Sequence, residues 1–125
     1  MSAQTLLSTG DQWFSYSGVI QGDVSAPATI QLNYIPNTGL RDSIVRVIPF
    51  FGSNVTTSPP QIGILIKIND VEIYKSVPHR DYGAAKDTDG FQLFVPRQSK
   101  LEVISLNTSG NNTQDRGCNL LGYYL

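Results

Sequence analysis

The chain has 125 residues, 40% of them hydrophobic, which is enough for one domain whose core needs neither a metal ion nor a disulfide. Nine lysine and arginine residues against ten aspartate and glutamate residues give a formal net charge of −1. This balance argues against nucleic-acid binding, which needs a basic excess or stripe. No apolar run reaches the roughly 18 residues that span a bilayer, and the single cysteine, Cys118, excludes an internal disulfide.

The first ten residues, MSAQTLLSTG, have neither the charged segment nor the long apolar segment of a signal peptide, so we expect synthesis in a cytoplasm. Leu6 and Leu7 are flanked there by serine, threonine and glycine. We expect residues 1–10 to form an extended N-terminal arm and residues 11–125 to form a single domain. Two interpretations of the arm stay open: a frayed terminus, or an extension that docks on a neighbouring subunit.

The first two expected strands follow the arm. Residues 11–20, DQWFSYSGVI, form a long strand with aromatic side chains on both faces. Residues 28–34 alternate between apolar and polar side chains, as a strand with one buried face does. The side chains expected to share that buried face are Ala28, Ile30, Leu32 and Tyr34.

The third expected strand covers residues 43–51, SIVRVIPFF, which are apolar at most positions. Such a run is typical of a strand that is buried on both faces or lies at the centre of a sheet. Pro49 cannot donate a hydrogen bond to a neighbouring strand, so we expect the strand to end or bulge there. A polar loop closed by proline follows at residues 52–60.

Residues 61–77, QIGILIKINDVEIYKSV, show the clearest alternation in the chain. Isoleucines stand at every second position from Ile62 to Ile68, as in a half-buried strand. Asn69 and Asp70 tolerate positive φ, so they predict a two-residue turn and therefore a β-hairpin. Its isoleucine face needs a second sheet to cover it.

The rest of the chain alternates polar loops, at residues 78–90 and 107–117, with expected strands at 91–95, 101–106 and 118–125. This gives eight or nine short strands with turn signals between them, and no window shows a helical apolar stripe. The pattern predicts an all-β fold, either an antiparallel sandwich or a barrel.

The residues with reactive side chains do not assemble into a recognisable catalytic set. His79 and three aspartates of the same loop offer ligands for a hard cation, but their spacing does not match an EF-hand and Lys86 lies among them. We favour a solvated loop. Cys118 begins an apolar strand, where a buried and inert thiol is expected. We therefore predict no enzyme activity, no cofactor and no metal site.

The aromatic residues allow three interpretations: core filling, a protein–protein interface, or a sugar-binding surface. An interface would draw on the arm, on the loop at residues 78–90 and on exposed aromatic side chains. The residues expected to contact a partner are Leu6, Leu7, Trp13, His79, Arg80, Tyr82, Tyr123 and Tyr124.

Three segments carry a family resemblance: IKINDVEIYKS, FQLFVPRQSKLEVISLN and the closing LLGYYL. In the second, a strand reaches Val95-Pro96, turns over a polar tetrapeptide and returns through Leu101. This looks like the penultimate strand pair of small jelly-roll proteins of tailed-phage virions, especially capsid cement or decoration proteins. The resemblance covers residues 11–125 as a pattern and implies an antiparallel β-sandwich of jelly-roll type.

The resemblance also implies a function. Decoration proteins lie on the outer capsid surface and stabilise the shell by bridging subunits of the major capsid protein, often as dimers or trimers. We therefore expect a virion protein that is made in the host cytoplasm, forms a homo-oligomer and has no nucleic-acid or membrane partner. The alternative is a carbohydrate- or receptor-binding head of a phage fibre or tail, which predicts a coplanar aromatic pair on an exposed face.

Overall fold

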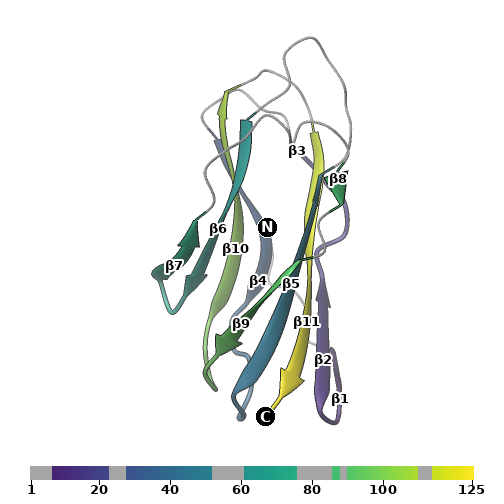
Figure 1. The fold of residues 1–125 in the computed structure, drawn as a ribbon, viewed down its shortest axis with the longest axis vertical. Coiled ribbons are helices and arrows are strands. Elements are labelled where there is room, and N and C mark those ends of the chain that lie inside the picture. The colour runs from purple at the N-terminus through teal and green to yellow at the C-terminus, as the bar shows by residue number, and fades with distance from the viewer. Residues whose placement is uncertain (1–6, 23–27, 52–60, 76–85, 88–89, 110–113) are drawn as a thin grey trace.

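A computed structural model describes residues 7–22, 28–51, 61–75, 86–87, 90–109 and 114–125. These ranges form two antiparallel β-sheets that face each other across one core (Figure 1). Within them the chain forms 11 strands and no helix. The predicted all-β sandwich is therefore confirmed.

Seven of the described strands form the larger sheet and four form the smaller one. The larger sheet contains β1 (Leu7–Thr9), β2 (Gln12–Tyr16), β3 (Ile20–Gly22), β5 (Ser43–Phe51), β8 (Lys86–Asp87), β9 (Phe91–Val95) and β11 (Gln114–Tyr124). The smaller sheet contains β4 (Ala28–Ile35), β6 (Gln61–Ile68), β7 (Val71–Lys75) and β10 (Leu101–Ser109). The strands β1, β3 and β8 have only two or three residues, and the other eight match the predicted number.

The strand order is that of a jelly roll. The long strands run β2–β11–β5–β9 in the larger sheet and β4–β10–β6–β7 in the smaller one. Of the described long strands, only β6 and β7 are both consecutive in the chain and neighbours in a sheet. Counted among the eight long strands, the first pairs with the last (β2 with β11), the second with the seventh (β4 with β10), the third with the sixth (β5 with β9) and the fourth with the fifth (β6 with β7). The chain is thus one long hairpin rolled into two layers.

The tip of that rolled hairpin is the predicted turn between β6 and β7. Asn69 and Asp70 have φ angles of 51° and 68°, as the two central residues of a type I′ turn require. The side-chain oxygen of Asn69 accepts a hydrogen bond from the backbone N–H of Lys100 at 2.8 Å. The backbone N–H of Asn69 donates to the Lys100 carbonyl at 2.9 Å. The turn is therefore confirmed and is anchored to the segment before β10.

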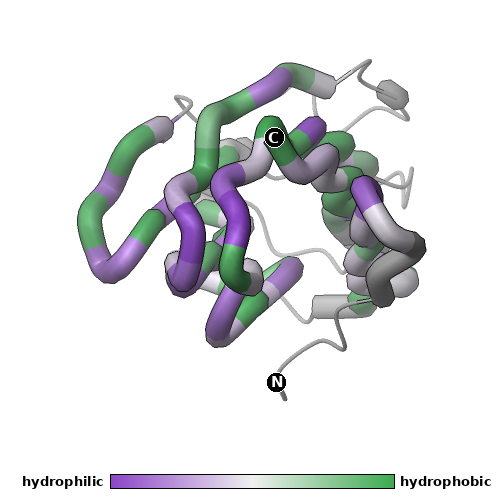
Figure 2. Tube along the Cα trace, turned by 90° about the horizontal axis from the view of Figure 1, so that it is seen from below, coloured by the Kyte–Doolittle hydropathy of each residue, from purple (hydrophilic) through white to green (hydrophobic). Residues whose placement is uncertain are grey.

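The core lies between the two sheets and is filled mainly by aliphatic side chains. Hydrophobic and hydrophilic residues alternate along the chain in the view from below (Figure 2). Ile64 and Ile66 of β6 point inward, as predicted, and meet side chains of the larger sheet. The buried cluster contains Trp13, Leu32, Ile35, Val45, Val47, Ile64, Ile66, Val95, Leu101, Val103, Cys118 and Leu120.

The predicted face of the second strand is wrong beyond Leu32, because β4 contains a β-bulge there. Val103 of β10 pairs with Asn33 and the next residue pairs with Gln31, so Leu32 is an extra residue in β4. An extra residue reverses which side chains point inward. Leu32, Asn33 and Ile35 are consequently buried, whereas Tyr34 is only half-buried.

The bulge brings a polar side chain into the core, where its hydrogen bonds are satisfied. The amide nitrogen of Asn33 donates to the carbonyl oxygens of Ser15 at 3.1 Å and of Cys118 at 2.9 Å. Its amide oxygen accepts a hydrogen bond from the Ser15 hydroxyl at 2.9 Å. Asn33 therefore links the smaller sheet to β2 and β11 of the larger one by contacts that depend on register.

The third strand lies at the centre of the larger sheet, as expected, but it neither ends nor bulges at Pro49. Pro49 pairs in register with Cys118 of β11. On the other side, the pairing with β9 stops at Val47 and the pairing with β8 begins at Phe50. Pro49 lies between the segments of β5 that pair with β9 and with β8. The N–H that proline lacks is therefore not needed for a hydrogen bond to either strand.

Several expected boundaries differ in the structure. The first strand is split into β2 and β3 around Gly18, which has a φ of 70°. Leu7–Thr9, expected in the arm, form β1 and pair with β2. Within the expected loop at 78–90, Lys86–Asp87 form β8, and within the loop at 107–117 the strands extend to Ser109 and from Gln114.

The strands on either side of Val95-Pro96 do not pair with each other. β9 belongs to the larger sheet and pairs with β5, whereas β10 belongs to the smaller sheet. The polar turn between them is present, with Gln98 at a φ of 54°, but it carries the chain across the core. A turn signal in the sequence marks a change of direction and does not say which sheet the chain enters.

We predict that Gly122→Ala destabilises the fold strongly, because Gly122 leaves room for the ring of Trp13. A Cβ at position 122 would overlap the Cε2 and Nε1 atoms of Trp13, which is fully buried. Overpacking typically costs about 1–3 kcal/mol, and we expect the upper end of this range. Urea unfolding measures the loss. In a Trp13→Leu background the same substitution should cost much less, and an equal cost in both backgrounds would contradict the packing explanation.

Candidate interaction surface

The side of the larger sheet that faces away from the core carries an unusual number of apolar side chains. We call this side the outer face. Successive side chains of a strand point to opposite sides of the sheet. In β2, β11, β5 and β9 the residues that alternate with the buried ones therefore lie on the outer face. They are Gln12, Phe14, Tyr16, Asn119, Leu121, Tyr123, Ile44, Arg46, Ile48, Gln92 and Phe94.

Pairing registers arrange these side chains in rows across the sheet. In the first row Tyr123 lies opposite Ile44, and Ile44 lies opposite Phe94. Tyr123 is 42% exposed and Phe94 is 52% exposed. Leu125, two residues beyond Tyr123, is 64% exposed and continues the apolar surface toward one end of the sandwich.

The next two rows extend the outer face along the strands. Leu121 lies between Phe14 and Arg46, and Arg46 lies opposite Gln92. In the third row Asn119 lies between Tyr16 and Ile48. The rings of Phe14 and Tyr16 are 6.3 Å apart with an interplanar angle of 28°.

The corresponding side of the smaller sheet carries charged side chains beside apolar ones such as Leu65 and Ile104. Glu102 lies opposite Lys67, which lies opposite Glu72, and Leu65 lies opposite Lys75. The side chain of Gln31 donates to Glu102 at 3.1 Å. Among the described side chains of the outer face, by contrast, Arg46 alone is charged. The two sides of the sandwich therefore differ in the partners that they suit.

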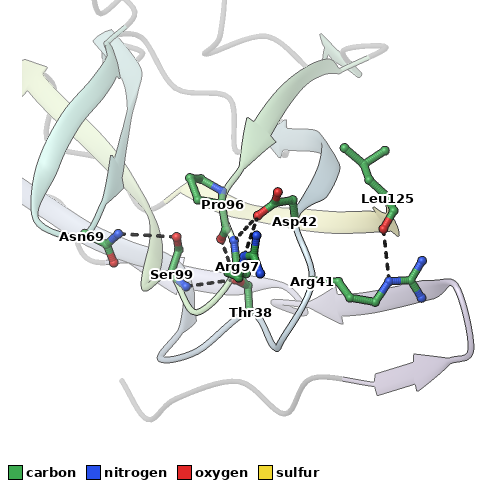
Figure 3. A network of polar contacts seen from close by, with 8 residues as sticks. All are labelled: Thr38, Arg41, Asp42, Asn69, Pro96, Arg97, Ser99 and Leu125. Atoms are coloured by element: carbon green, nitrogen blue, oxygen red, sulfur yellow. Dashed lines mark hydrogen bonds and ion pairs between the residues drawn. The ribbon is translucent and has the colours of Figure 1, made fainter.

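One end of the sandwich is held by a network of polar contacts (Figure 3). The Thr38 amide donates to the Ser99 carbonyl at 2.9 Å, and the Ser99 amide donates to the Thr38 hydroxyl at 3.1 Å. The Thr38 hydroxyl also donates to the Pro96 carbonyl at 3.3 Å. Asp42 accepts a hydrogen bond from the Arg97 amide at 2.8 Å. These bonds join the β4–β5 and β9–β10 connections.

The last residues of the chain belong to the same network. The Nε of Arg41 donates to the Leu125 carbonyl at 3.2 Å, and its Nη1 contacts Asp11 at 3.0 Å. The guanidinium lies 5.3 Å from the centre of the Tyr124 ring. The Leu125 amide donates to the Asp42 carbonyl at 2.9 Å, which extends the pairing of β11 with β5 by one residue.

The structure separates the residues that were expected to contact a partner. Tyr123 lies exposed on the outer face. Tyr124 points the other way and donates from its hydroxyl to the Thr38 carbonyl at 3.2 Å. Trp13 is fully buried and donates to the Ser43 hydroxyl at 3.4 Å, so its side chain has no surface to offer. Leu7 pairs with Phe14 through the backbone, and Leu6, His79, Arg80 and Tyr82 lie outside the described residues.

The sequence interpretation missed most of the outer face. Phe14, Ile44, Leu121 and Phe94 were not among the expected contact residues. The alternation of residues 91–95 contained the signal for Phe94, because it places Phe94 on the face opposite Leu93 and Val95. A single exposed aromatic residue is ordinary on a protein surface, so Phe94 becomes informative only beside Ile44 and Tyr123 in the fold.

Two reactive groups are buried. Cys118 is fully buried, as predicted, and burial raises the pKa of its thiol to about 12. Arg116 is also fully buried and donates to the Ser105 hydroxyl at 2.9 Å; desolvation lowers the pKa of its guanidinium.

The described part of the chain contains no group of three potential metal ligands and no helix suited to cross a membrane. Most of the expected cation ligands, His79 among them, lie outside that part.

We predict that the free energy of unfolding falls between pH 8 and pH 10 partly because of Cys118. An unfolded thiol loses its proton near pH 9, while the native thiol keeps its proton up to about pH 12. The unfolded state is therefore stabilised as the pH rises, by about 1.4 kcal/mol at pH 10. Urea unfolding at both pH values measures this change. In Cys118→Ala the fall should be smaller by that amount, and an identical fall in both proteins would contradict the assignment.

Comparison with known proteins finds likeness only in the fold. No protein-family model and no curated protein matches the sequence. The structure is similar to VP2 in a crystal structure of a subviral particle of infectious bursal disease virus, with a TM-score of 0.56 and 10% identity. A structure of the Gx strain of that virus gives a TM-score of 0.52 and 13% identity. Each match covers 90% of this chain and 32% of the other, so the chain spans about a third of their length.

Proposed function

We propose that this chain is a structural component of a virus particle, in which the outer face holds it against a neighbouring subunit. The observation that carries the proposal is the apolar row of Tyr123, Ile44 and Phe94 across three adjacent strands, in which Tyr123 and Phe94 are exposed and Ile44 is half-buried. Contiguous apolar surface of this kind marks interaction sites on soluble proteins. The jelly-roll fold shared with VP2 of a subviral particle supports the same proposal.

The role is mechanical and needs no catalytic group. Covering the outer face would remove apolar surface from water, at about 25 cal/mol per Å². Aromatic side chains such as Tyr123 and Phe94 lose little conformational freedom on binding, which makes them efficient contact residues. The network at the adjoining end of the sandwich fixes the backbone of β5 and β11 before a partner arrives, so less ordering accompanies association.

Within this role we propose the specific task of a capsid cement protein of a tailed phage. The sequence resemblance of the segments from IKINDVEIYKS to LLGYYL supports this task. The partner would be the major capsid protein, and the location would be the outer surface of the virion. Binding to the assembled shell and not to its dissociated subunits would stabilise the shell by mass action.

One observation favours the alternative of a receptor- or carbohydrate-binding head. The rings of Phe14 and Tyr16 lie on the same face at an interplanar angle of 28°, and Tyr16 is exposed. Sugar rings stack on aromatic surfaces of this type. Trp13, which was a candidate for the same surface, is fully buried. A glycan array distinguishes the alternatives, because a cement protein should bind none of the glycans.

We predict that the chain is an integral constituent of purified particles. Particles from the source of this sequence, purified on a density gradient, should contain the chain in a fixed ratio to their shell protein, as measured by quantitative mass spectrometry. Antibodies against the chain should label the outside of intact particles. Removal of its gene should lower the temperature at which particles release their genome. Recovery of the chain only outside particles would overturn the proposal.

The N-terminal arm is proposed as a second contact, and the structure sharpens its test. Leu7–Thr9 pair with β2, so a deletion that reaches them would damage the larger sheet as well as the arm. Deletion of residues 2–6 leaves that pairing intact. We expect this deletion to lower the occupancy of the chain on particles several-fold without changing the midpoint of thermal unfolding. Unchanged occupancy would remove the arm from the proposed interface.

A further inference from the structure

We propose that β9 pairs antiparallel with β9 of a second copy of this chain, around a two-fold axis that passes through Leu93. The two larger sheets would then form one continuous sheet. β9 pairs with β5 on one side, and no other described strand pairs with it. The contact uses the free edge of the larger sheet, so the outer face stays available to the shell. The proposal does not depend on the proposed function.

Three of the described sheet edges are protected against pairing with another strand. Edge strands carry unpaired N–H and C=O groups, and natural sheets protect them by short strands, bulges, prolines or charged side chains. The edge strand β1 has only three residues, and β4 contains the bulge at Leu32. The edge strand β7 contains a bulge at Ile73 and carries the charged residues Glu72 and Lys75.

The edge formed by β9 has none of these protections. Its five residues, FQLFV, include no charged residue and no proline, and they pair with β5 from Phe91 to Val95 without a register shift. Alternate residues of an antiparallel strand direct their N–H and C=O groups away from the neighbouring strand. β8, which lies along the same edge of β5, has only two residues. β9 therefore offers another strand a regular row of backbone groups.

Two-fold symmetry restricts the register of this pairing. An axis perpendicular to the sheet keeps each residue on the same side of the sheet in both copies, and residues that lie opposite each other must share a side. The axis must therefore pass through a residue and not between two residues. An axis at Leu93 pairs all five residues of β9. An axis at Phe94 would bring Pro96, which has no N–H, into the new ladder.

The side chains of β9 suit a second copy of the same strand in this register. On the core side Leu93 meets Leu93, and Phe91 meets Val95 of the second copy. Phe91 and Leu93 pack against the core but are only half-buried, so a neighbouring strand would remove more of their apolar surface from water. On the outer side Phe94 meets Gln92 of the second copy. No like charges face each other, and the contact is self-complementary, as a two-fold interface requires.

The pairing would also enlarge the outer face. Its row of Tyr123, Ile44 and Phe94 would continue into Gln92 of the second copy. A shell subunit would then meet one surface built from two copies, so the two contacts would reinforce each other. The neighbouring β7 leaves the edge accessible: Tyr74 packs its ring on Phe91 from the smaller sheet, with ring centres 4.7 Å apart, but β7 forms no backbone pairing with β9.

The length of the contact predicts a weak dimer. Five residue pairs at about 3.4 Å per residue give a contact roughly 17 Å long. A contact of this size lies below the roughly 1,200 Å² of total buried surface at which stable interfaces begin. We therefore expect a reversible dimer with a dissociation constant on the order of 100 µM.

Sedimentation equilibrium of the full chain tests the proposal with two matched double variants, Gln92→Glu/Phe94→Lys and Gln92→Glu/Phe94→Glu. Both lose the Phe94 ring and both place a carboxylate beside Arg46 within the chain. They differ only in the charge that lies opposite position 92 of the second copy. We expect the lysine variant to dimerise with a dissociation constant at least tenfold lower than that of the glutamate variant, because oppositely charged cross-strand pairs are favourable and like charges are not.

Two single variants control for other contacts. Tyr123→Glu changes an exposed residue of the outer face two strands away from β9, and Val71→Lys changes an exposed residue of the β7 edge. Neither should change the dissociation constant of the dimer. Equal midpoints of thermal unfolding for the two double variants show that a difference between them comes from association and not from the fold.

Disulfide trapping tests the register. Opposite residues of an antiparallel pair have Cα atoms about 4.5–5.5 Å apart, within the range of a disulfide, whereas diagonal residues lie about 7–8 Å apart. A mixture of Gln92→Cys and Phe94→Cys chains should therefore form linked heterodimers under mild oxidation faster than either variant links to itself. Cys118 should stay unmodified because it is fully buried.

Three results would overturn the proposal: a monomer at every concentration, equal dissociation constants for the two double variants, or cysteine variants that link to themselves as fast as to each other. Particle occupancy is measured separately. A monomer that still enters particles would refute the dimer and leave the proposed function standing, whereas a dimer that never enters particles would do the reverse.

Discussion

Burial of one face of each sheet against the other is the interaction on which every other feature of this molecule depends. Each long strand offers aliphatic side chains at alternate positions, and neither sheet could leave that face in water. The closest fit lies between Trp13 and Gly122, where the absence of a side chain on β11 makes room for an indole ring. The rolled hairpin satisfies this constraint, because it places neighbouring segments of the chain in opposite layers.

Hydrophobic burial alone would tolerate several registers of the two sheets, and the buried polar groups distinguish among them. Asn33 reaches across the core to backbone carbonyls of β2 and β11. Moving either sheet by one residue would leave an amide without partners in an apolar environment, which typically costs about 1–3 kcal/mol. The β-bulge at Leu32 is what turns Asn33 inward, so a local irregularity of β4 helps to specify the global arrangement.

The same alternation that fills the core leaves a second set of side chains on the outside, and there the two sheets differ. The smaller sheet carries Glu102, Lys67, Glu72 and Lys75 on its outward side, beside apolar residues such as Leu65 and Ile104, whereas the larger sheet carries mainly aromatic and aliphatic groups there. An isolated chain gains nothing from such a surface. This asymmetry, more than the fold itself, is the basis of the proposed role in an assembly.

Alternation, turn residues and the absence of helical periodicity are local properties, and the sequence by itself determined what depends on them. These are the all-β class, the eight long strands, the Asn69-Asp70 turn, the inward face of β6 and the buried thiol of Cys118. Only the tertiary structure decided the bulge that reverses β4, the placement of β9 and β10 in different sheets, and the burial of Trp13 beside an exposed Phe94. The reason is physical: a strand's pattern shows that it has two unlike faces, but which face meets the core, and which strand lies beside it, depends on residues far away in the chain.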